Sequence, residues 1–457
     1  MPHPLLVSLR DLCLREVPDD AARRAALHVA DWLGCAVAGA ATPPGQAFRR
    51  EAAVSGGDGP VRSVGHMGRL PVRQAAFLMG ALGNPLEMDD LDKRAILHPG
   101  PAIVPAALAA AQLADASGPD LLRGIVRGYE ATIRLGRSVG AGHYAQWHTT
   151  ATCGPLGAAV ASASIFGLDP EETLWAMGNA LTQASGPWAC RHEDVMTKQL
   201  HAAHAAEAGV SAALLARAGV TGPAHILDGP QGFYAGMCPD PAPEAITADP
   251  EAWRIFEVSF KPWPACRHCH PAIDAALALR PQVPATATIT GIEISVYGDS
   301  ARFCDRAHPT TDVEAKFSLQ HAVAVALLRG RPTIPDFGAD ARADEALAAL
   351  RLRAQVRVDP ALEAAYPGHY GARLALQLAD GRRLEETRAD AFGDPEDPMS
   401  DREVAAKATG LMIWAGLSKE EAGALLERAA ALPDMELAHW FAEALPMKIR
   451  HDQPSAA

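Results

Sequence analysis

The spacing of apolar residues changes twice along the chain, and this feature constrains the fold more than any other. Up to about residue 264, apolar residues recur at helical spacing, as in 20–41, where small residues allow close helix packing. Residues 286–297 instead alternate and are rich in β-branched side chains, which is typical of a strand. Helical spacing returns near residue 400. We therefore predict a mainly α protein: a discontinuous all-α helical-bundle domain (1–264 and 398–457) with a smaller inserted α+β domain (265–397).

Further elements are expected within this layout. Asp169-Pro170-Glu171-Glu172 is typical of a helix start, and Ser418 opens another helix before Lys419-Glu420-Glu421. An amphipathic helix is predicted over 312–328, and strands over 352–358 and 372–378, the second followed by a turn at 379–382. Helical spacing also recurs in the first domain, over 72–84, 102–115, 119–140, 154–166, 170–186, 199–218 and, more weakly, 223–235.

Charge and composition exclude several classes of protein. The chain has 41 Lys and Arg against 54 Asp and Glu, a net charge of −13, which is opposite in sign to that of most nucleic-acid-binding proteins. Because no run of about 18 apolar residues occurs, no transmembrane helix is predicted. The first residues, MPHPLLVSLRDLCLREV, carry charges within the apolar stretch and do not form a secretory signal. We expect a cytoplasmic protein with reduced thiols that binds neither nucleic acid nor membrane.

Two short patterns suggest metals but lack a complete ligand set. Cys266-Arg267-His268-Cys269-His270 matches the string that attaches haem, but that chemistry normally needs an exported chain, and a zinc site would need a second ligand pair. Buried thiols beside a functional histidine are the favoured interpretation. His201 and His204 lie one helical turn apart without a visible third ligand. Each is expected to be a core histidine bonded to a backbone carbonyl, and no metal or cofactor is predicted.

Polar residues interrupt the apolar helices in two segments of the first domain. Glu87-Met88-Asp89-Asp90-Leu91-Asp92-Lys93 ends an apolar helix and is followed by His98, fixed by the next proline. It is either a solvated turn or a polar loop that carries chemistry. His148 and Thr149 start a helix in the second segment. The amide donors of a helix N-terminus favour a carboxylate, although these residues could also simply cap the helix.

Two lysines stand in apolar surroundings without an adjacent acid. Lys198 opens an Ala-rich helix, and Lys261 lies between an aromatic residue and a rigid Pro-Trp-Pro turn. A buried cation without a partner is costly, so an anionic ligand is the expected partner of each. The alternative is that each side chain reaches solvent along its alkyl stem. We predict that both ammonium groups project into one cleft between the domains and hold substrate carboxylates.

Common cofactor motifs are missing from the sequence. No phosphate-binding G-x-x-x-x-G-K-[ST] loop, no dinucleotide-binding G-x-G-x-x-G loop and no G-x-S-x-G elbow occurs. The remaining set of His, Lys, Tyr and acidic side chains suits proton transfer at a carbon next to a carboxylate.

Together these segments resemble the MmgE/PrpD family, which includes 2-methylcitrate dehydratase, cis-aconitate decarboxylase and iminodisuccinate epimerase. The matching strings occur in the family's order and span nearly the whole chain: DWLGCAVAGA, the acid cluster before HPG, WHTTATCGPLGAA, TKQLHAAHAAEAG and FKPWPACRHCHPAID. The resemblance implies a large discontinuous helical domain, a smaller α+β domain, a homodimer, and chemistry without metal or cofactor.

The resemblance also implies which residues form the site, in a cleft between the domains. Family positions fall on Glu87, Asp90, His98, His148, Lys198 and Lys261, with His270 as a further candidate. The chain departs from the pattern, because Glu87-Met88-Asp89-Asp90-Leu91 stands where dehydratase-like and decarboxylase-like members carry Asp-Phe-Asp-Asp-Thr. Lys93 and Tyr144 resemble bases proposed for the epimerase branch. We predict catalytic roles for His98, His148, Lys198, Asp90, Tyr144 and Lys93, and substrate contacts from Lys261, Glu87, His270 and Thr149.

The expected function is a cofactor-free hydro-lyase that acts on a small di- or tricarboxylate. One of His98, His148 or Lys198 would take the proton, and a second group would protonate the departing hydroxyl. An epimerase would instead place two bases, such as Lys93 and Tyr144, on opposite faces of one carbon. A decarboxylase is a third expectation, and a non-catalytic carboxylate-binding protein is a fourth. In each catalytic case, Lys198 and Lys261 would stabilise charge on the substrate.

Overall fold

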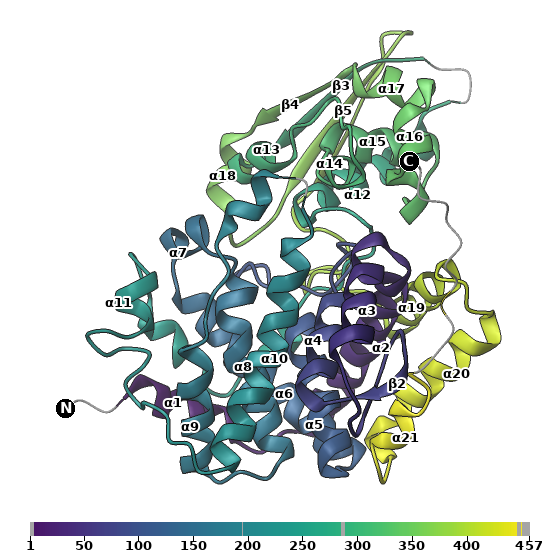
Figure 1. Cartoon of the computed structure of the whole chain (residues 1–457). Coiled ribbons are helices and arrows are strands. Elements are labelled where there is room, and N and C mark those ends of the chain that lie inside the picture. The colour runs from purple at the N-terminus through teal and green to yellow at the C-terminus, as the bar shows by residue number, and fades with distance from the viewer. Residues whose placement is uncertain (1–3, 194, 285–287, 446–448, 450–457) are drawn as a thin grey trace. The chain divides into compact units, whose positions relative to one another are not determined.

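The computed structural model describes residues 4–193, 195–284, 288–445 and 449. The chain divides into two compact units (Figure 1). Unit 1 comprises Met1–Pro85, Asp89–Val258 and Ser400–Ala457, and unit 2 comprises Leu86–Met88 and Ser259–Met399. Unit 1 is almost entirely helical, and unit 2 combines helices with a four-stranded sheet. This confirms the predicted mainly α class, with a discontinuous helical part and a smaller α+β part.

Unit 1 is a bundle of helices with one short hairpin. Asp169 caps α9 and Ser418 caps α20 through capping boxes, as their sequences predict. The α-helices are α1 (Leu5–Cys13), α2 (Asp19–Ala41), α3 (Pro43–Ser55), α4 (Val72–Leu82), α5 (Gly100–Ala114), α6 (Gly118–Ser138), α7 (Ala141–Gln146), α8 (Thr149–Ile165), α9 (Pro170–Leu181), α10 (Thr197–Arg217), α11 (Phe233–Met237), α19 (Asp401–Trp414), α20 (Lys419–Ala430) and α21 (His439–Ala442). The 3₁₀ helices are η1 (Trp188–His192), η2 (Pro243–Ile246), η3 (Arg254–Glu257) and η7 (Leu432–Asp434), and the strands are β1 (Val61–Ser63) and β2 (His66–Leu70).

Small residues bring the central helices of unit 1 into close contact. Helix α8 packs against α6 and α10. A side chain at Gly209 of α10 would start 2.2 Å from the Cβ of Ala158 in α8, and one at Gly157 would start 2.6 Å from the carbonyl oxygen of Gly128 in α6. Only glycine allows such an approach. The N-terminal ends of α8 and α10, which carry the predicted site residues, are therefore set on a rigid support.

Unit 2 is built on a mixed sheet with the strand order β4-β3-β5-β6. Strand β3 pairs in parallel with β4 and antiparallel with β5, which pairs antiparallel with β6. The strands are β3 (Ile289–Val296), β4 (Ala354–Val358), β5 (Ala372–Leu378) and β6 (Arg383–Arg388). The helices are η4 (Arg267–Cys269), α12 (His270–Leu279), η5 (Arg280–Gln282), α13 (Gly298–Cys304), α14 (Asp312–Lys316), α15 (Leu319–Leu328), η6 (Ile334–Phe337), α16 (Ala339–Ala343), α17 (Glu345–Arg351) and α18 (Pro360–Ala365).

The core of unit 2 lies between the sheet and two of its helices. Ile294 of β3 pairs with Leu374 of β5, and both are fully buried. They share one apolar cluster with Ile273 of α12 and Val323 of α15. The alternation predicted for 286–297 and 372–378 therefore corresponds to β3 and β5, although residues 285–287 lie outside the described residues.

Four details differ from the sequence expectations. The weak helix over 223–235 is wrong, because the glycines at 229 and 232 make turns before the short α11. The single helix over 312–328 is two helices, because Ser318 leaves helical geometry and its hydroxyl caps α15. Strands β1 and β2 form an unpredicted hairpin. Strand β6 was missed because its sequence, RLEETR, is mostly charged, as suits an edge strand.

Among the described residues, no single helix is long and apolar enough to cross a membrane. Only α2 and α3 taken together pass by length and composition, and they are bent by 84° at their junction.

Candidate active site

Asp90 anchors the acidic loop of unit 1 through its side chain. One carboxylate oxygen lies 2.8 Å from Nδ1 of His28 and accepts the hydroxyl of Tyr129 at 2.6 Å, and the other accepts the backbone N–H of Gly100 at 2.8 Å. Burial raises the pKa of Tyr129 well above its usual value, so this hydroxyl stays protonated and donates. A side chain at position 100 would start 2.7 Å from Asp90. Asp90, predicted as catalytic, therefore has the contacts of a residue that positions the loop.

His98 is oriented by the same loop. Its Nδ1 lies 3.0 Å from a carboxylate oxygen of Asp89 and 2.8 Å from the backbone carbonyl oxygen of Asp90. Its backbone N–H donates to the hydroxyl of Thr150 at 2.9 Å. Because a carbonyl oxygen can only accept, Nδ1 must carry the proton. In the neutral ring, Nε2 then has the basic lone pair, which is the arrangement of a general base held by a carboxylate.

His148 precedes the first turn of α8 and faces a second histidine. Its Nδ1 lies 3.1 Å from Nδ1 of His201 in α10. Two facing nitrogens can share only one proton, so the two rings have complementary tautomers. Burial lowers the pKa of His148 well below its usual value, and the charges of Lys198, His201 and His98 lower it further. His148 is therefore neutral near pH 7.

The two histidines of α10 have different environments. Burial, followed by the charges of Lys198 and His204, lowers the pKa of His201 to about 4. His204 lies 3.3 Å from the carbonyl oxygen of Gln183, as expected of a core histidine. The same expectation is wrong for His201, because its partner is the imidazole of His148 rather than a carbonyl. The expectation for His201 was based on the sequence of its own helix, which does not show that His148, at the start of α8, lies next to it.

Lys198 lies at the start of α10, as the sequence predicts, and is half-buried rather than fully buried. Its positive charge lowers the pKa of both His148 and His201. For the Cys190 thiol, burial raises the pKa, and the charge of Lys198 partly offsets this effect. The charge of His98 also lowers the pKa of His148, whereas that of Asp89 raises it. Residues of the acidic loop and of the start of α10 therefore lie within electrostatic range of His148.

Trp188, in η1, is a site residue that sequence analysis missed. Its ring centroid lies 4.4 Å from that of His148 and 5.9 Å, edge-on, from that of Tyr144. The backbone N–H of His148 donates to the carbonyl oxygen of Gly186, which brings this turn against the start of α8. The available signal was an aromatic residue directly after Gly186-Pro187, a turn between two helices.

The N-terminal end of α8 has polar groups without protein partners. His148 precedes the helix without a side-chain cap. Within the part of the chain that the structure describes, the buried hydroxyl of Thr149 and the buried indole Nε1 of Trp188 have no hydrogen-bond partner. Buried polar groups are normally paired. These two donors lie next to the positive end of the helix, where an anion is favoured.

A cavity of about 350 Å³ opens next to His201. His204, Phe77 and Leu200 also line it, together with the turn that leads to Trp188. Its volume is in the lower range of small-molecule pockets, about 300–1,000 Å³. Unit 1 therefore has space for a small ligand beside the imidazole pair.

In unit 2, Lys261 has an acidic partner that sequence spacing did not reveal. Its Nζ donates to the backbone carbonyl oxygen of Glu87 at 3.2 Å and lies 3.4 Å from the Glu87 carboxylate. The side chain of Lys261 is only 1% exposed. The two residues are 174 positions apart, so the expectation that Lys261 has no neighbouring acid is wrong. Glu87, predicted to contact substrate, is the partner of Lys261.

His270 is held in the interior of unit 2. Its Nε2 lies 3.0 Å from the carbonyl oxygen of Ala265, and its Nδ1 lies 3.1 Å from the guanidinium of Arg267. Arg267 also pairs with the buried Asp394. These contacts fix one neutral tautomer, with the proton on Nε2. They favour a positioning role for His270, and its predicted contact with substrate stays a prediction.

The thiols of the C-x-x-C-H string are buried, as predicted. Cys266 and Cys269 are free thiols, and both form hydrogen bonds with the side chain of Cys304. The hydrogen bond with Cys304, and then burial, raises the pKa of Cys266 well above its usual value. Such thiols are protonated at neutral pH and therefore poor nucleophiles.

The two residues proposed for an epimerase both belong to unit 1. Lys93 is buried in the acidic loop. It follows Asp92 in sequence, and Asp92 is fixed by an ion pair with Arg137 and by a backbone bridge to Leu97. Tyr144 is half-buried against Trp188. Their action as two opposed bases stays a prediction.

The fold and the candidate site describe a protein with histidines at the helix ends of a helical unit and a buried lysine–glutamate pair in an α+β unit. The chain belongs to the MmgE/PrpD family: the family's N-terminal domain matches residues 9–246 and its C-terminal domain matches residues 263–431. This confirms the resemblance seen in the sequence.

Named relatives include two kinds of enzyme. A cis-aconitate decarboxylase-like protein of Aspergillus oryzae is 28% identical over 86% of this chain and 86% of its own length. The cis-aconitate decarboxylase of Mus musculus is 28% identical over 74% of this chain and 71% of its own. The 2-methylcitrate dehydratase of Escherichia coli is 28% identical over 49% of each chain.

Proposed function

We propose that this protein is a lyase that removes water from a small hydroxylated di- or tricarboxylate, with His98 taking the proton next to a carboxylate. The observation that carries the proposal is the orientation of His98. Its Nδ1–H is directed to the Asp90 carbonyl and the Asp89 carboxylate, so Nε2 is the nitrogen able to accept a proton. No metal or organic cofactor is needed for such a step.

The contacts of His98 also explain how the proton is retained. When Nε2 takes a proton, the ring becomes a cation, and the Asp89 carboxylate 3.0 Å from Nδ1 stabilises that charge. The hydroxyl of Thr150 accepts the backbone N–H of His98, which holds the residue in place. Positioned acid–base groups contribute about 10²–10⁴-fold to a rate.

The start of α8 supplies the seat for a substrate carboxylate. The Thr149 hydroxyl, the Trp188 indole N–H and the positive end of the helix favour an anion there. Lys198, which acts on His148 electrostatically, adds a full positive charge. As negative charge develops on the carboxylate during proton removal, these groups stabilise it more strongly than in the ground state.

Lys198 is the proposed acid for the departing hydroxyl, because its ammonium group carries a proton whereas both imidazoles beside it are neutral. His148 and His201, hydrogen-bonded across 3.1 Å, hold each other in place at the start of the two helices. In the complete step, the C–H bond breaks toward His98, the C–O bond breaks, and the hydroxyl leaves as water with a proton from Lys198. Lys261 and Glu87 belong to unit 2, and their part in binding substrate is a further element of the proposal.

Decarboxylation is the second candidate. Two relatives that match most of this chain are named cis-aconitate decarboxylase or cis-aconitate decarboxylase-like. In that reaction the C–C bond to a carboxylate breaks, CO₂ leaves, and a protonated histidine delivers a proton to the carbon. The same residues would serve, but His98 would have to begin as an acid. An epimerase that uses Lys93 and Tyr144 is a third candidate, and a non-catalytic carboxylate-binding protein is a fourth.

One assay separates these functions. The purified protein is incubated in deuterated water with a panel of hydroxy-tricarboxylates, hydroxy-dicarboxylates and unsaturated tricarboxylates. A hydro-lyase forms the alkene with loss of water. A decarboxylase releases CO₂ and places one deuterium on carbon, and an epimerase incorporates deuterium without loss of any group. Absence of any change across the panel, with His98→Gln as the matched inactive control, would refute an enzymatic function.

A further inference from the structure

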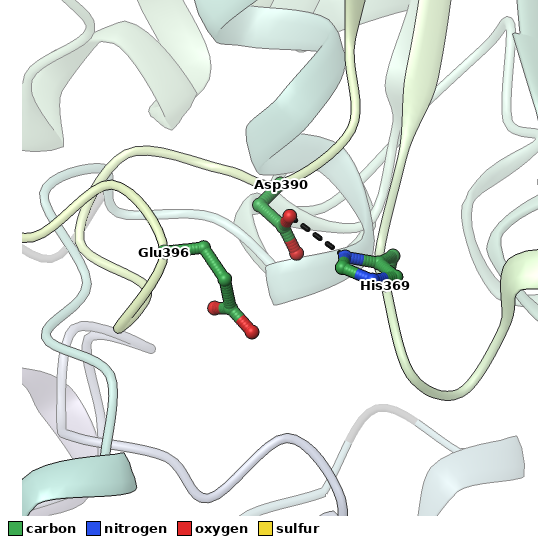
Figure 2. A group of neighbouring side chains, drawn as sticks. All are labelled: His369, Asp390 and Glu396. Carbon is green, nitrogen blue, oxygen red and sulfur yellow. Dashed lines mark hydrogen bonds and ion pairs between the residues drawn. The ribbon is translucent and has the colours of Figure 1, made fainter.

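Three residues of unit 2 bring metal-ligating atoms together, and none of them belongs to the candidate active site. A nitrogen of His369 and one carboxylate oxygen each of Asp390 and Glu396 all lie within 4.8 Å of one another. Figure 2 shows Asp390 with its carboxylate directed to the imidazole, and Nδ1 of His369 lies 2.8 Å from one oxygen. The side chain of His369 is 52% exposed and that of Asp390 is 10% exposed, so an ion could enter from solvent.

Strand pairing explains why residues far apart in sequence meet here. Ala372 of β5 pairs with Arg388 at the end of β6. His369 precedes that pair by three residues and Asp390 follows it by two, so both emerge from the same end of the β5–β6 ladder. Glu396 comes from the turn after β6, where the backbones of Asp394 and Asp397 form a bridge. No sequence spacing reveals this group, because each ligand stands alone in the chain.

Each ligand is flanked by residues that are fixed in the unit. Tyr370, next to His369, is buried and stacks on His268 with ring centroids 5.6 Å apart. Beyond Asp390, the backbone N–H of Phe392 donates to Asp274 at 2.8 Å. The turn that carries Glu396 is anchored by the buried Asp394, which pairs with Arg267. The backbone that carries the ligands is therefore already fixed, and only side chains have to move when an ion binds.

We propose that His369, Asp390 and Glu396 form a binding site for a divalent transition-metal ion such as Zn²⁺. Ligand atoms around one Zn²⁺ lie about 3–3.5 Å apart at bond lengths near 2.0–2.2 Å, so rotation of exposed side chains is enough to close the group. One imidazole nitrogen and two carboxylate oxygens form a donor set of intermediate hardness. Such a set suits Zn²⁺ or Mn²⁺ better than Ca²⁺, which takes six to eight oxygen ligands. Water completes the coordination.

The ion would have a structural role. It would tie the end of the β5–β6 pair to the turn at Glu396, shortly before the chain leaves unit 2 at Met399. None of the three ligands belongs to the proposed proton-transfer groups, and the site does not depend on the proposed function. Binding would therefore stabilise the fold of unit 2 and leave the chemistry unchanged.

The test is metal binding by the full chain after treatment with a chelator and its removal. Equilibrium dialysis against Zn²⁺ is compared for the parent protein, His369→Ala, Asp390→Asn and Glu396→Gln. We expect each variant to lose one equivalent of Zn²⁺, or to bind it at least about tenfold more weakly. The matched controls are His308→Ala and Asp380→Asn, which change exposed residues of the same unit away from the group. Both should keep the full stoichiometry.

A second measurement keeps the result clear if Zn²⁺ also binds to cysteines elsewhere. Co²⁺ at this site should give visible d–d bands without a thiolate charge-transfer band, and His369→Ala should remove them. The same Zn²⁺ stoichiometry and affinity in the parent protein and all three variants would overturn the proposal. So would a preference for Ca²⁺ over Zn²⁺, or Zn²⁺ binding that depends on the carboxylates but not on His369.

Discussion

The Nδ1 atoms of His148 and His201 face each other at 3.1 Å, so this pair holds a single proton between two buried rings. Both rings have a pKa below that of free histidine, and that of His201 is lowered to about 4. Two helices that start at different points of the chain are therefore linked by one pair of histidines, with consequences for the pH dependence of stability.

We predict that this pair makes unit 1 less stable in acid. In the unfolded chain each histidine binds a proton below its ordinary pKa of 6.5, whereas in the folded protein His201 does so only near pH 4. The unfolded state therefore binds more protons in this window, and stability falls as the pH drops from about 6.5 toward 4. Urea unfolding at several pH values should show a shallower decline for His201→Gln. Parallel pH profiles of the two proteins would contradict this.

Asp89 should matter to catalysis mainly through His98. Asp89→Asn keeps the size of the side chain but removes the charge that stabilises a protonated His98 ring 3.0 Å away. We expect kcat to fall by about 10²–10⁴-fold, with a similar loss in His98→Gln. The double variant should lose little more than either single one, because the two residues act as a unit. Asp11→Asn, at an exposed position, is the control, and additive losses would argue against a shared role.

Replacing Thr149 or Thr150 by valine makes the same chemical change at neighbouring positions, but we expect the first to affect substrate binding and the second to affect stability. The Thr149 hydroxyl has no partner among the described residues, so Thr149→Val should not reduce stability. It should raise KM by about 10–100-fold, the equivalent of one hydrogen bond to a charged group. Thr150→Val loses the bond to the amide of His98 and should cost about 1 kcal/mol of stability. Denaturant titrations and steady-state kinetics measure both. A destabilised Thr149→Val with an unchanged KM would reverse the assignment.

Lys261→Met should weaken the fold as well as any reaction. The substitution leaves the buried Glu87 carboxylate without the ammonium 3.4 Å away, and breaking a buried pair costs about 3–5 kcal/mol. Removing both charges, in Lys261→Met with Glu87→Gln, should recover part of that loss. Urea unfolding of the parent protein and both variants measures the effect. If Lys261→Met were as stable as the parent, the ion pair would contribute nothing to the free energy of unfolding.

Much of the fold could be predicted because its signals are local. The spacing of apolar residues gives α2, α8 and α10, and alternation gives β3 and β5. The same approach missed β6, because a charged edge strand buries too little to leave an apolar pattern. It also placed one helix where Ser318 separates two, since a cap inside an apolar stretch is easily overlooked.

The candidate site was less accessible to prediction, because its contacts are long-range. The sequence indicated His98, His148 and Lys198, since polar residues at the ends of apolar helices stand out. It could not show that Nδ1 of His98 is directed to Asp89, or that Lys261 pairs with Glu87 across 174 positions. The sequence around Trp188 indicates its role only weakly, and no local pattern indicates that Asp390 and Glu396 lie close to His369.

The three residues Leu86–Met88 belong to unit 2, although the chain on both sides of them belongs to unit 1. Glu87 has a left-handed backbone with φ of 58°, costly for a residue with a side chain, and Lys261 bonds to its carbonyl oxygen. A fragment spanning 259–399 would therefore bury an ammonium group without its carboxylate. We therefore expect that the second unit cannot be excised or exchanged between proteins at its apparent ends without loss of stability, because one of its contacts is encoded far upstream.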